Sequence, residues 1–540
     1  MAIGCDSESL KRAGLNIGLT VVSGALLSAA FPSHDLPLLA WVAFVPLFFA
    51  LARSRPMAAF ILSFAWGFVF YTDYFFFMFD LPRYSFLHHA LLGVYLCPLT
   101  GLFGCFFCVL WRRVSPAAAL LAAPFAWVSQ EYIRCNFFFL ALPWALVGHS
   151  QYQNPAIIQM AEFTGAYGVS FWIVCVNAAL TALVFLLPKS RFDSGVMLRS
   201  RSVWAWTAAV ALVTVGLAAY GRAQLAQEPS GREFKLSVIQ PSIEQEKKWD
   251  QTNAAAVMAV ISDLTHQAAQ DKPALIVWPE TATPKSITTD RQLYEQVRDI
   301  AAAADSYLLF GSAQLAKFKV GDAQSARFKN SAYLVPPARN GPKVQQYEKV
   351  RLVPFGEYLP HADIIPWKRL YVPEVQGYMP GNKFVLFKMG SVAFGAPICW
   401  ENIFSEDARQ FVQEGAQFLI NITNEAWFGH SAAPYQFLSM NVFRAVENRV
   451  YVVRCANTGI SCFIDRQGRV VSRVRGADGS EIGARGFLTG TVRLGGEKTF
   501  FTRHGDLFAK ACLVIAALVL VAAIPIELIL KRYQRKDSQA

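Results

Sequence analysis

Apolar residues gather in long runs over the first 220 residues of the chain and again near its end. A helix that crosses a membrane needs roughly 20 consecutive, mostly apolar residues. The first run has no small-residue cleavage site after it and is followed at once by another run, so it is interpreted as a retained helix and not as a signal peptide. Eight runs predict eight transmembrane helices: 15–31, 36–51, 57–79, 90–110, 117–128, 169–187, 204–220 and 509–530.

The stretch between the seventh and eighth runs is polar and mixed. Segments rich in β-branched and aromatic residues alternate there with helical patterns. Because the expected strands are apolar throughout, they predict sheets that are covered on both faces. The expected strands are 234–240, 274–280, 306–314, 331–337, 391–400, 418–424 and 451–457, and the expected helices are 252–270, 290–304, 403–414 and 434–447.

These patterns predict a polytopic α-helical membrane bundle with an inserted α/β domain. We expect a seven-helix bundle over residues 1–220, the inserted domain over 221–508, an eighth span over 509–530 and a basic tail over 531–540. The composition agrees, because 54% of the residues are hydrophobic, above the 45–50% that is typical of soluble domains.

The chain has a net charge of +12, and many of its Lys and Arg residues lie in the loops between the apolar runs. No basic patch interleaves with aromatic residues, so a nucleic-acid site is disfavoured. Cytoplasmic loops carry an excess of Lys and Arg, which predicts that both termini are cytoplasmic and that the inserted domain lies outside the cytoplasm. The opposite short loops hold Arg83 and Arg134. Fourteen cations lie in alternate loops on one side: Lys11, Arg12, Arg53, Arg55, Arg112, Arg113, Lys189, Arg191, Arg199, Arg201, Lys531, Arg532, Arg535 and Lys536.

Three of the ten cysteines lie in the inserted domain: Cys399, Cys455 and Cys462. An odd number leaves at least one free thiol in an oxidising compartment. Cys455 and Cys462 flank a turn and could pair, a possibility that the sequence leaves open. The other seven lie in or beside apolar runs, where packing is their default role and a zinc site is disfavoured.

Chemically active side chains stand where the expected strands of the inserted domain end. Glu280 closes ALIVWPE, Cys399 closes VAFGAPIC, and Lys349 and Glu357 lie between them in YEKVRLVPFGEYLP. In α/β domains such strand ends collect active-site residues. A thiol needs a base or a nearby cation to react at neutral pH. Glu280 could accept its proton, and Lys349 could stabilise the thiolate and the oxyanion.

Each residue also has a structural interpretation. A buried strand-end cysteine is usually a packing residue, the glutamate of WPE could cap a turn, and Lys349 could be solvated. The combination is much more specific than any one residue.

The motifs VWPE, YEKVRLVPFGEYLP and ICWE, in this order, resemble the carbon–nitrogen hydrolase (nitrilase) superfamily and its Glu–Lys–Cys triad. Seven helices, this domain and a further helix together resemble the apolipoprotein N-acyltransferase family. QPSIEQEKKWD, NITNEAWFG and LPWALVGHSQ extend the likeness over nearly the whole chain. The resemblance implies an α-β-β-α sandwich for the inserted domain.

The resemblance also implies roles for individual residues. Glu280 becomes the general base, Lys349 the cation at the transition state and Cys399 the nucleophile, with Glu357 as a supporting carboxylate. Stretches 361–381 and 426–435 have the aromatic, Pro and Gly content of a hydrophobic lid, or of ordinary surface loops. The expected substrate-binding residues are Trp249, Trp400, Glu401, Trp427 and Tyr435.

The implied reaction is a two-step acyl transfer through a thioester on Cys399. The donor is a phospholipid, typically phosphatidylethanolamine, and the acceptor is the N-terminal diacylglyceryl-cysteine of an apolipoprotein. The resemblance implies no metal and no cofactor, a monomer, and a place in the bacterial inner membrane with a periplasmic catalytic domain. Trp400, Glu425 and Arg351 depart from the residues expected in the family, which puts the pocket shape and lipid preference in question but not the triad.

Two other interpretations stay open. A membrane-bound amidase or nitrilase would use the same triad, with water as the acceptor, although a small-molecule amidase does not need eight helices. A transporter or receptor with an inactive outer domain would be expected to show internal repeats and broken helices, and the sequence has neither.

Overall fold

The computed structural model describes residues 7–32, 34–82, 84–137, 140–185, 200–228, 230–320, 323–339, 341–370 and 377–537. The chain divides into two compact units. The first comprises Met1–Phe79, Tyr84–Ala226 and Asp506–Ala540, and the second comprises Asp80–Arg83 and Gln227–Gly505. The polar middle of the sequence therefore folds as a unit of its own, apart from the apolar runs.

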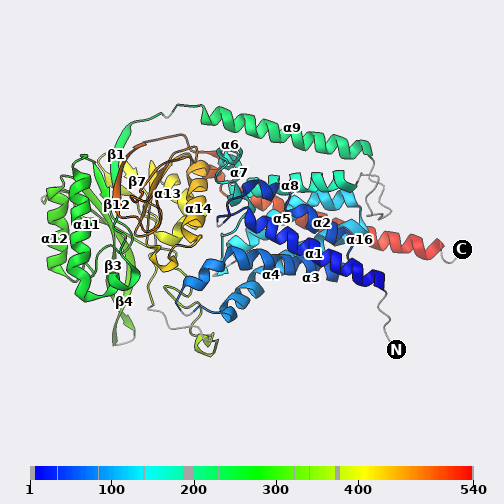
Figure 1. Ribbon diagram of the computed structural model, residues 1–540, viewed down its shortest axis with the longest axis horizontal. Helices are drawn as coiled ribbons and strands as arrows, with labels where there is room; N and C mark the ends of the chain where they lie inside the picture. The colour runs from blue at the N-terminus through cyan, green and yellow to red at the C-terminus, as the bar shows by residue number, and fades with distance from the viewer. Residues whose placement is uncertain are drawn as a thin grey trace. The chain divides into compact units, whose positions relative to one another are not determined.

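The first unit is helical (Figure 1). Proline opens α3 and α5, at the first helical position, where its missing N–H is not needed. The elements are α1 (Ser7–Ala29), η1 (Pro37–Trp41), α2 (Phe44–Ala52), α3 (Pro56–Tyr74), η2 (Phe76–Asp80), α4 (Phe86–Arg113), α5 (Pro116–Asn136), η4 (Val147–Gln151), α6 (Pro155–Ile158), α7 (Ala161–Thr164), α8 (Ala166–Phe185), α9 (Ser200–Leu225) and α16 (Leu507–Asp537).

Seven of the eight apolar runs fall mainly within one helix of this unit, and the run 36–51 is divided between η1 and α2. Among the described residues, five helices are long and apolar enough to cross a membrane, namely those over Leu10–Ala29, Pro56–Tyr74, Phe86–Arg113, Ala166–Phe185 and Arg201–Leu225. Pro37–Ala52 and Leu507–Ala523 are shorter apolar segments. Several membrane-crossing helices are thus supported, and the count of eight stays a prediction.

Aromatic rings and small residues pack the helices of this unit together. The rings of Trp66 and Trp127 meet edge to face with centroids 5.4 Å apart. A Cβ atom on Gly104 would lie 2.0 Å from the Oγ of Ser63 and 2.6 Å from the carbonyl oxygen of Ala59. Glycine at this position therefore lets α4 approach α3 closely, which is how membrane helices commonly associate.

Two buried charged residues at the end of α5 fix the loop that follows it. Glu131 accepts hydrogen bonds from Trp127 Nε1 at 3.0 Å and from the backbone N–H of Val147 at 2.8 Å. Arg134 donates to the carbonyl oxygens of Leu142, Trp144 and Ala145. Backbone groups away from water need such partners, so both residues hold the LPWALVGHSQ segment in an irregular conformation.

The second unit is an α/β domain. Its strands are β1 (Glu233–Gln240), β2 (Leu275–Val277), β3 (Tyr307–Val320), β4 (Ala323–Val335), β5 (Gln345–Glu348), β6 (Phe387–Met389), β7 (Val392–Phe394), β8 (Phe418–Thr423), β9 (Tyr451–Ala456), β10 (Cys462–Ile464), β11 (Val470–Arg473) and β12 (Gly486–Arg493). Its helices are α10 (Gln245–Trp249), η5 (Gln251–Asn253), α11 (Ala254–Ala269), α12 (Arg291–Ala303), η6 (Trp367–Leu370), η7 (Cys399–Ile403), α13 (Ser405–Gln413), η8 (Ala426–Phe428), α14 (Ala433–Asn448) and α15 (Phe500–His504).

Two sheets form the centre of this domain. The larger has the strand order β12-β1-β2-β3-β4-β5, and the smaller has the order β11-β10-β9-β8. Strand β9 packs against β1, and the thiol of Cys455 on β9 points at the carbonyl oxygens of Ile239 and Val277. Helices α11 and α12 cover the larger sheet (Figure 1), while α13 and α14 pack on the smaller one. The layers therefore run helices, sheet, sheet, helices.

Helix α12 shows why the outer layer forms. Its buried residues Leu293, Val297, Ile300 and Ala301 recur at helical spacing and face the core. The side chain of Asp290 accepts a hydrogen bond from the N–H of Leu293 at 3.0 Å and caps the helix.

The four expected helices of the domain are present within a few residues, but two expected strands are shorter than predicted. The stretch 391–400 is a strand only over Val392–Phe394, because Pro397 cannot donate to a ladder and Cys399 is left-handed. The stretch 274–280 is a strand only over Leu275–Val277, before Pro279. The sequence analysis also missed β5, β6, β10, β11 and β12, which are short or only partly apolar.

Candidate active site

Glu280 lies just beyond β2, and its buried carboxylate is held on both oxygens. Its Oε1 accepts a hydrogen bond from the side-chain amide of Asn330 at 2.7 Å. Its Oε2 accepts one from the backbone N–H of Asn424 at 2.8 Å. The Nζ of Lys349 lies 3.5 Å from Oε1. The carboxylate is thus fixed by donors from two different sheets, with a cation beside it.

Lys349 follows β5 directly and is almost fully buried, with 1% of its side chain exposed. Its backbone N–H donates to the carbonyl oxygen of Asn330 at 2.8 Å, which extends the pairing of β5 with β4. Its Nζ donates to Glu357 Oε1 at 2.9 Å. Burial lowers the pKa of Lys349, but the carboxylates of Glu357 and Glu280 outweigh it and raise that pKa above its ordinary value. Lys349 is therefore a permanent cation.

Glu357 completes this cluster from the turn that follows Lys349. Its Oε2 accepts a hydrogen bond from the backbone N–H of Val353 at 2.8 Å, so the carboxylate also stabilises the Pro-Phe-Gly turn. Asn330 donates to Oε1 of Glu357 at 3.1 Å as well as to Glu280. One amide group therefore bridges the two carboxylates that flank Lys349.

Cys399 stands at the start of η7 with a backbone φ of 51°, in the left-handed region that non-glycine residues seldom adopt. The bridge between Ile398 and Ile422 fixes the residue before it. The side-chain amide of Asn421 donates to the carbonyl oxygens of Pro397 at 3.1 Å and Cys399 at 3.3 Å. A strained backbone that is held so firmly is typical of a functional position.

The electrostatic surroundings keep the Cys399 thiol protonated. Burial and the charge of Glu280 raise its pKa to about 12, while Lys349 and the hydroxyl of Thr423 oppose that shift. The charges of Glu280 and Lys349 thus act on the sulfur from two other segments of the chain. A thiol in this state needs a base that removes its proton as it attacks.

Glu401, which the sequence analysis placed among the substrate-binding residues, is held by hydrogen bonds within the domain. It is fully buried, and both its oxygens accept hydrogen bonds from within the domain. Oε1 accepts from Tyr347 Oη at 2.8 Å and from the N–H groups of Val350 and Arg351, and Oε2 accepts from the N–H of Ile398 at 2.7 Å. Glu401 therefore ties the segment of Lys349 to the turn of Cys399.

The other expected substrate-binding residues are less buried. Trp400 and Tyr435 are half-buried, and 45% of Trp427 is exposed. The backbone of Trp249 lies in α10, but its side chain is outside the described part of the chain. Of the stretch 361–381 proposed as a lid, residues 371–376 also lie outside it.

The sequence analysis missed several polar residues of this site. Asn330 and Asn424 hold Glu280, Thr423 faces the thiol, and the buried Lys248 donates to the backbone oxygen of Glu280. Thr423 is the last residue of β8 and Asn424 directly follows it, so a search of strand ends could have found both. Asn330 sits in the middle of a long strand and carried no such signal.

The other cysteines of the domain supply neither a bridge nor a metal site. Cys455 and Cys462 are both free and buried, so the pairing that the sequence left open is not formed. Within the described residues, no group of three or more His, Cys, Asp or Glu side chains could hold a metal ion.

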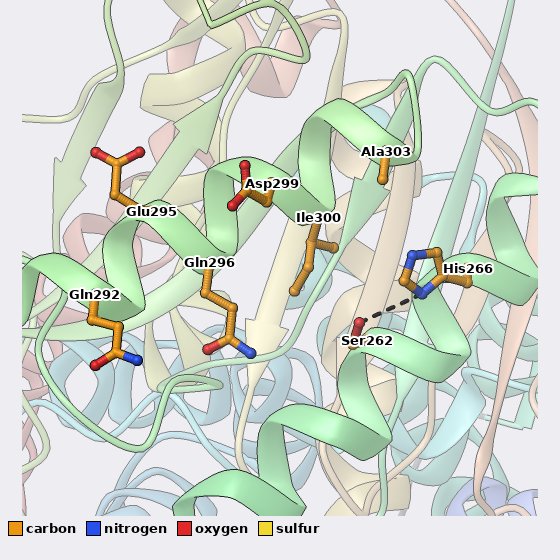
Figure 2. A pocket seen from close by; sticks show the side chains of 8 residues that line it. All are labelled: Ser262, His266, Gln292, Glu295, Gln296, Asp299, Ile300 and Ala303. Carbon is orange, nitrogen blue, oxygen red and sulfur yellow. Dashed lines mark hydrogen bonds between the residues drawn. The ribbon is translucent and has the colours of Figure 1, made fainter.

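A pocket lies elsewhere in the domain, between α11 and α12 (Figure 2). Six of its lining residues come from α12, and the other two, Ser262 and His266, come from α11. The Oγ of Ser262 lies 3.5 Å from Nδ1 of His266. The lining contains none of the strand-end residues described above, so the pocket is separate from the candidate active site. It is lined by Ser262, His266, Gln292, Glu295, Gln296, Asp299, Ile300 and Ala303.

Gly311 on β3 gives a first prediction about how the site is positioned. A Cβ atom there would lie 2.5 Å from the backbone nitrogen of Thr281 and 2.7 Å from the Cα of Glu280. Gly311→Ala should therefore destabilise the domain by about 1–3 kcal/mol and slow acyl transfer by about 100-fold, because Glu280 is displaced. Thermal unfolding and the initial rate measure the two effects.

Gly486→Ala is the matched control for Gly311→Ala, since Gly486 lies in the same sheet and its nearest outside atom would be 3.6 Å away. It should leave both stability and rate close to wild type. Equal behaviour of the two variants would contradict the proposed close contact.

The raised pKa of Cys399 gives a second prediction. Carboxamidomethylation of Cys399 should be slow at pH 7 and should still be rising above pH 9, because the thiol stays protonated over this range. In the chain unfolded by guanidinium, the rate of Cys399 carboxamidomethylation should stop rising above about pH 9, since an unperturbed thiol has a pKa of about 8.5. Peptide mass spectrometry measures the modification of Cys399 alone. A plateau near pH 7 in the folded protein would show a thiolate and contradict the assignment.

Comparison with known proteins finds a family match for the N-terminal helical part of the chain and another for the inserted domain. Residues 23–179 match the family model of the apolipoprotein N-acyltransferase N-terminal domain, and residues 235–485 match that of carbon-nitrogen hydrolase. The apolipoprotein N-acyltransferase of Geobacter metallireducens is 35% identical over 514 residues, which cover 94% of each chain. That of Chlorobaculum tepidum is 30% identical over 551 residues, which cover 94% of this chain and 96% of the relative.

Among solved structures, an amidase from Nesterenkonia sp. is 17% identical, with a TM-score of 0.35, and covers 52% of this chain and 94% of its own length. That likeness is too weak to add to the family match.

Proposed function

The chain belongs to the apolipoprotein N-acyltransferase family, and from that membership we propose that it moves an acyl chain from a phospholipid to the amino terminus of an apolipoprotein. The observation that carries the chemistry is the cluster of Glu280, Lys349 and Cys399. These residues come from three separate segments, the two charged groups lie 3.5 Å apart, and both shift the pKa of the thiol.

The first step forms a thioester. The Sγ of Cys399 attacks the ester carbonyl carbon of a phospholipid while Glu280 accepts the S–H proton. Lys349 stabilises the oxyanion of the tetrahedral intermediate, because a buried cation acts strongly on charge that develops in a site without water. The ester C–O bond then breaks, the glycerol oxygen takes the proton from Glu280, and a lysophospholipid leaves.

The second step consumes the thioester. The α-amino nitrogen of the diacylglyceryl-cysteine attacks the thioester carbonyl, and Glu280 accepts a proton from that nitrogen. The C–S bond breaks, and the sulfur of Cys399 takes the proton from Glu280 as it leaves. The product is a triacylated lipoprotein, and the enzyme returns to its starting state.

Glu357 and Glu401 act through their neighbours in this proposal. Glu357 orients Lys349 at 2.9 Å, and Glu401 sets the turn of Cys399 against the segment of Lys349. Trp249, Trp400, Trp427 and Tyr435 remain the proposed contacts for the substrates. Their partial exposure, described for all but Trp249, fits contact with a bound lipid.

The membrane part of the proposal rests on the helices of the first unit. Exposing acyl chains to water costs about 0.8 kcal/mol per CH₂, so an enzyme anchored in the bilayer avoids extracting its substrates. We propose the bacterial inner membrane as the location, both termini in the cytoplasm, the catalytic domain over 221–508 in the periplasm, eight spans, phosphatidylethanolamine as donor and a monomeric chain.

The reaction is tested with the full chain in detergent, a phospholipid labelled in its acyl chain, and a diacylglyceryl-cysteine peptide. We expect the label to appear in a triacylated peptide. Release of the label only as free fatty acid would favour the hydrolase alternative, which shares the triad. Unchanged phospholipid would contradict catalysis altogether and favour the receptor or transporter interpretation.

A further inference from the structure

Helix α10 carries two neighbouring lysines in very different environments. Lys247 is exposed, with 62% of its side chain accessible, and pairs with Glu244 at 2.9 Å. Lys248 is only 3% exposed, and its Nζ donates to the backbone carbonyl oxygen of Glu280 at 3.0 Å. One of the two lysines is therefore turned into the candidate active site.

A buried ammonium group is costly unless its surroundings compensate it. Within the described part of the chain, the carbonyl oxygen of Glu280 is the one acceptor that Lys248 Nζ reaches, although an ammonium has three donors. Burial lowers the pKa of Lys248 to about 8, and the nearby Glu280 and Cys399 oppose that shift. With the thiol of Cys399 protonated, the charged form of Lys248 is thus maintained mainly by the carboxylate of Glu280.

The balance of charge in the site shows what this lysine supplies. Two carboxylates, Glu280 and Glu357, flank the single ammonium of Lys349. With these groups alone, the attack of Cys399 would create negative charge in a region that already carries a net negative charge. Lys248 is a second cation that offsets this negative charge. Of the neighbouring carboxylates, Glu425 is paired with the buried Arg454, while Glu401, whose pKa burial raises to about 7, adds negative charge when it ionises.

Helix α10 is also joined to the base by a second contact. The Oε1 of Gln245 accepts a hydrogen bond from the side-chain amide of Asn424 at 2.9 Å. The backbone N–H of the same Asn424 donates to Oε2 of Glu280 at 2.8 Å. Lys248 therefore contacts Glu280 itself, and Gln245 contacts Asn424, which holds the carboxylate of Glu280.

We propose that Lys248 is a positioning residue of the acyl-transfer reaction, which holds the backbone of Glu280 and supplies the second positive charge that lets Cys399 attack. The inference rests on the proposed function of the Glu280–Lys349–Cys399 site. It assigns a role in catalysis to α10, a short helix that contains none of those three residues.

The test compares Lys248→Met, Lys248→Arg and the neighbouring Lys247→Met in the full chain. Formation of the acyl-enzyme from phospholipid is followed by intact mass as a function of pH, after each variant is shown to fold by its thermal transition. For Lys248→Met we expect a rate at pH 7 that is lower by roughly 10- to 100-fold, because a cation that favours negative charge on the sulfur is gone. The difference from wild type should narrow above about pH 8, where Lys248 loses its own charge. Lys248→Arg stays charged, so its rate relative to wild type should rise above about pH 8, and Lys247→Met should match wild type throughout.

A Lys248→Met profile that superimposes on wild type would overturn the inference and leave the proposed function standing. An acyl adduct absent from wild type would instead contradict the proposed function itself, before any variant is compared. If Lys248→Met does not fold, Lys248→Arg decides: a rate that rises relative to wild type above about pH 8 supports the charge role, and a constant ratio of the two rates across that pH contradicts it.

Discussion

Replacing Cys399 with alanine is expected to abolish the acyl-enzyme and to lower turnover by about 10⁴-fold or more. Removing the nucleophile of a covalent mechanism removes the whole two-step path, and in comparable enzymes it is among the most damaging single changes. Intact mass after incubation with phospholipid measures the result. Wild type should gain one acyl mass that hydroxylamine removes, and Cys399→Ala should gain none.

Cys462→Ala is the matched control, because Cys462 is also a free thiol but is buried in β10 away from the triad. It should form the adduct as wild type does. If wild type consumes phospholipid without any adduct, Cys399 is not a covalent catalyst, and direct transfer to the amine would replace the two-step proposal.

The sequence could predict that Glu280, Lys349 and Cys399 come close together, because each stands at the end of a strand or next to a turn. Pro279 and Pro397 mark where strands stop, and polar residues follow within two positions. What the sequence could not give is the geometry between them. The left-handed conformation of Cys399 depends on Asn421, which lies in another strand, and no local pattern encodes such a contact.

The missed strands show the same limit. Strand β12 pairs with β1 from Glu233 opposite Arg493 to Gln240 opposite Gly486, across about half of the chain. Its exposed and half-buried positions give little apolar signal. Pairing between distant segments is decided by tertiary packing, which overrides local propensity.

Glu401 illustrates how a motif can place a residue near a site without showing what the residue does there. Its place two residues after Cys399 pointed to the active site, and it does lie there. Complete burial and four donors from its own domain make it a support instead. Its pKa is raised to about 7 by burial, which the hydrogen bond from Ile398 opposes. Burial and the direction of hydrogen bonds, which separate contact from support, appear only in the folded structure.

Replacing Glu280 with glutamine is expected to change the reactivity of Cys399 in two opposite directions. Acyl transfer should fall by about 10²- to 10⁴-fold, because the general base that accepts the thiol proton is lost. Carboxamidomethylation of Cys399 at fixed pH should become faster. The negative charge of Glu280 raises the pKa of the thiol, so its removal lowers that pKa and increases the thiolate fraction.

Glu357→Gln and Lys349→Met are the controls that distinguish a role of Glu280 in proton transfer from a structural role. Glu357 also raises the pKa of Cys399, though less than Glu280 does, so Glu357→Gln should speed alkylation slightly and slow acyl transfer less. Lys349 lowers that pKa, so Lys349→Met should slow both reactions. A Glu280→Gln variant that slows both reactions equally would indicate a structural role. Faster alkylation with slower transfer requires that the carboxylate acts on the proton of Cys399 and not only on the fold around it.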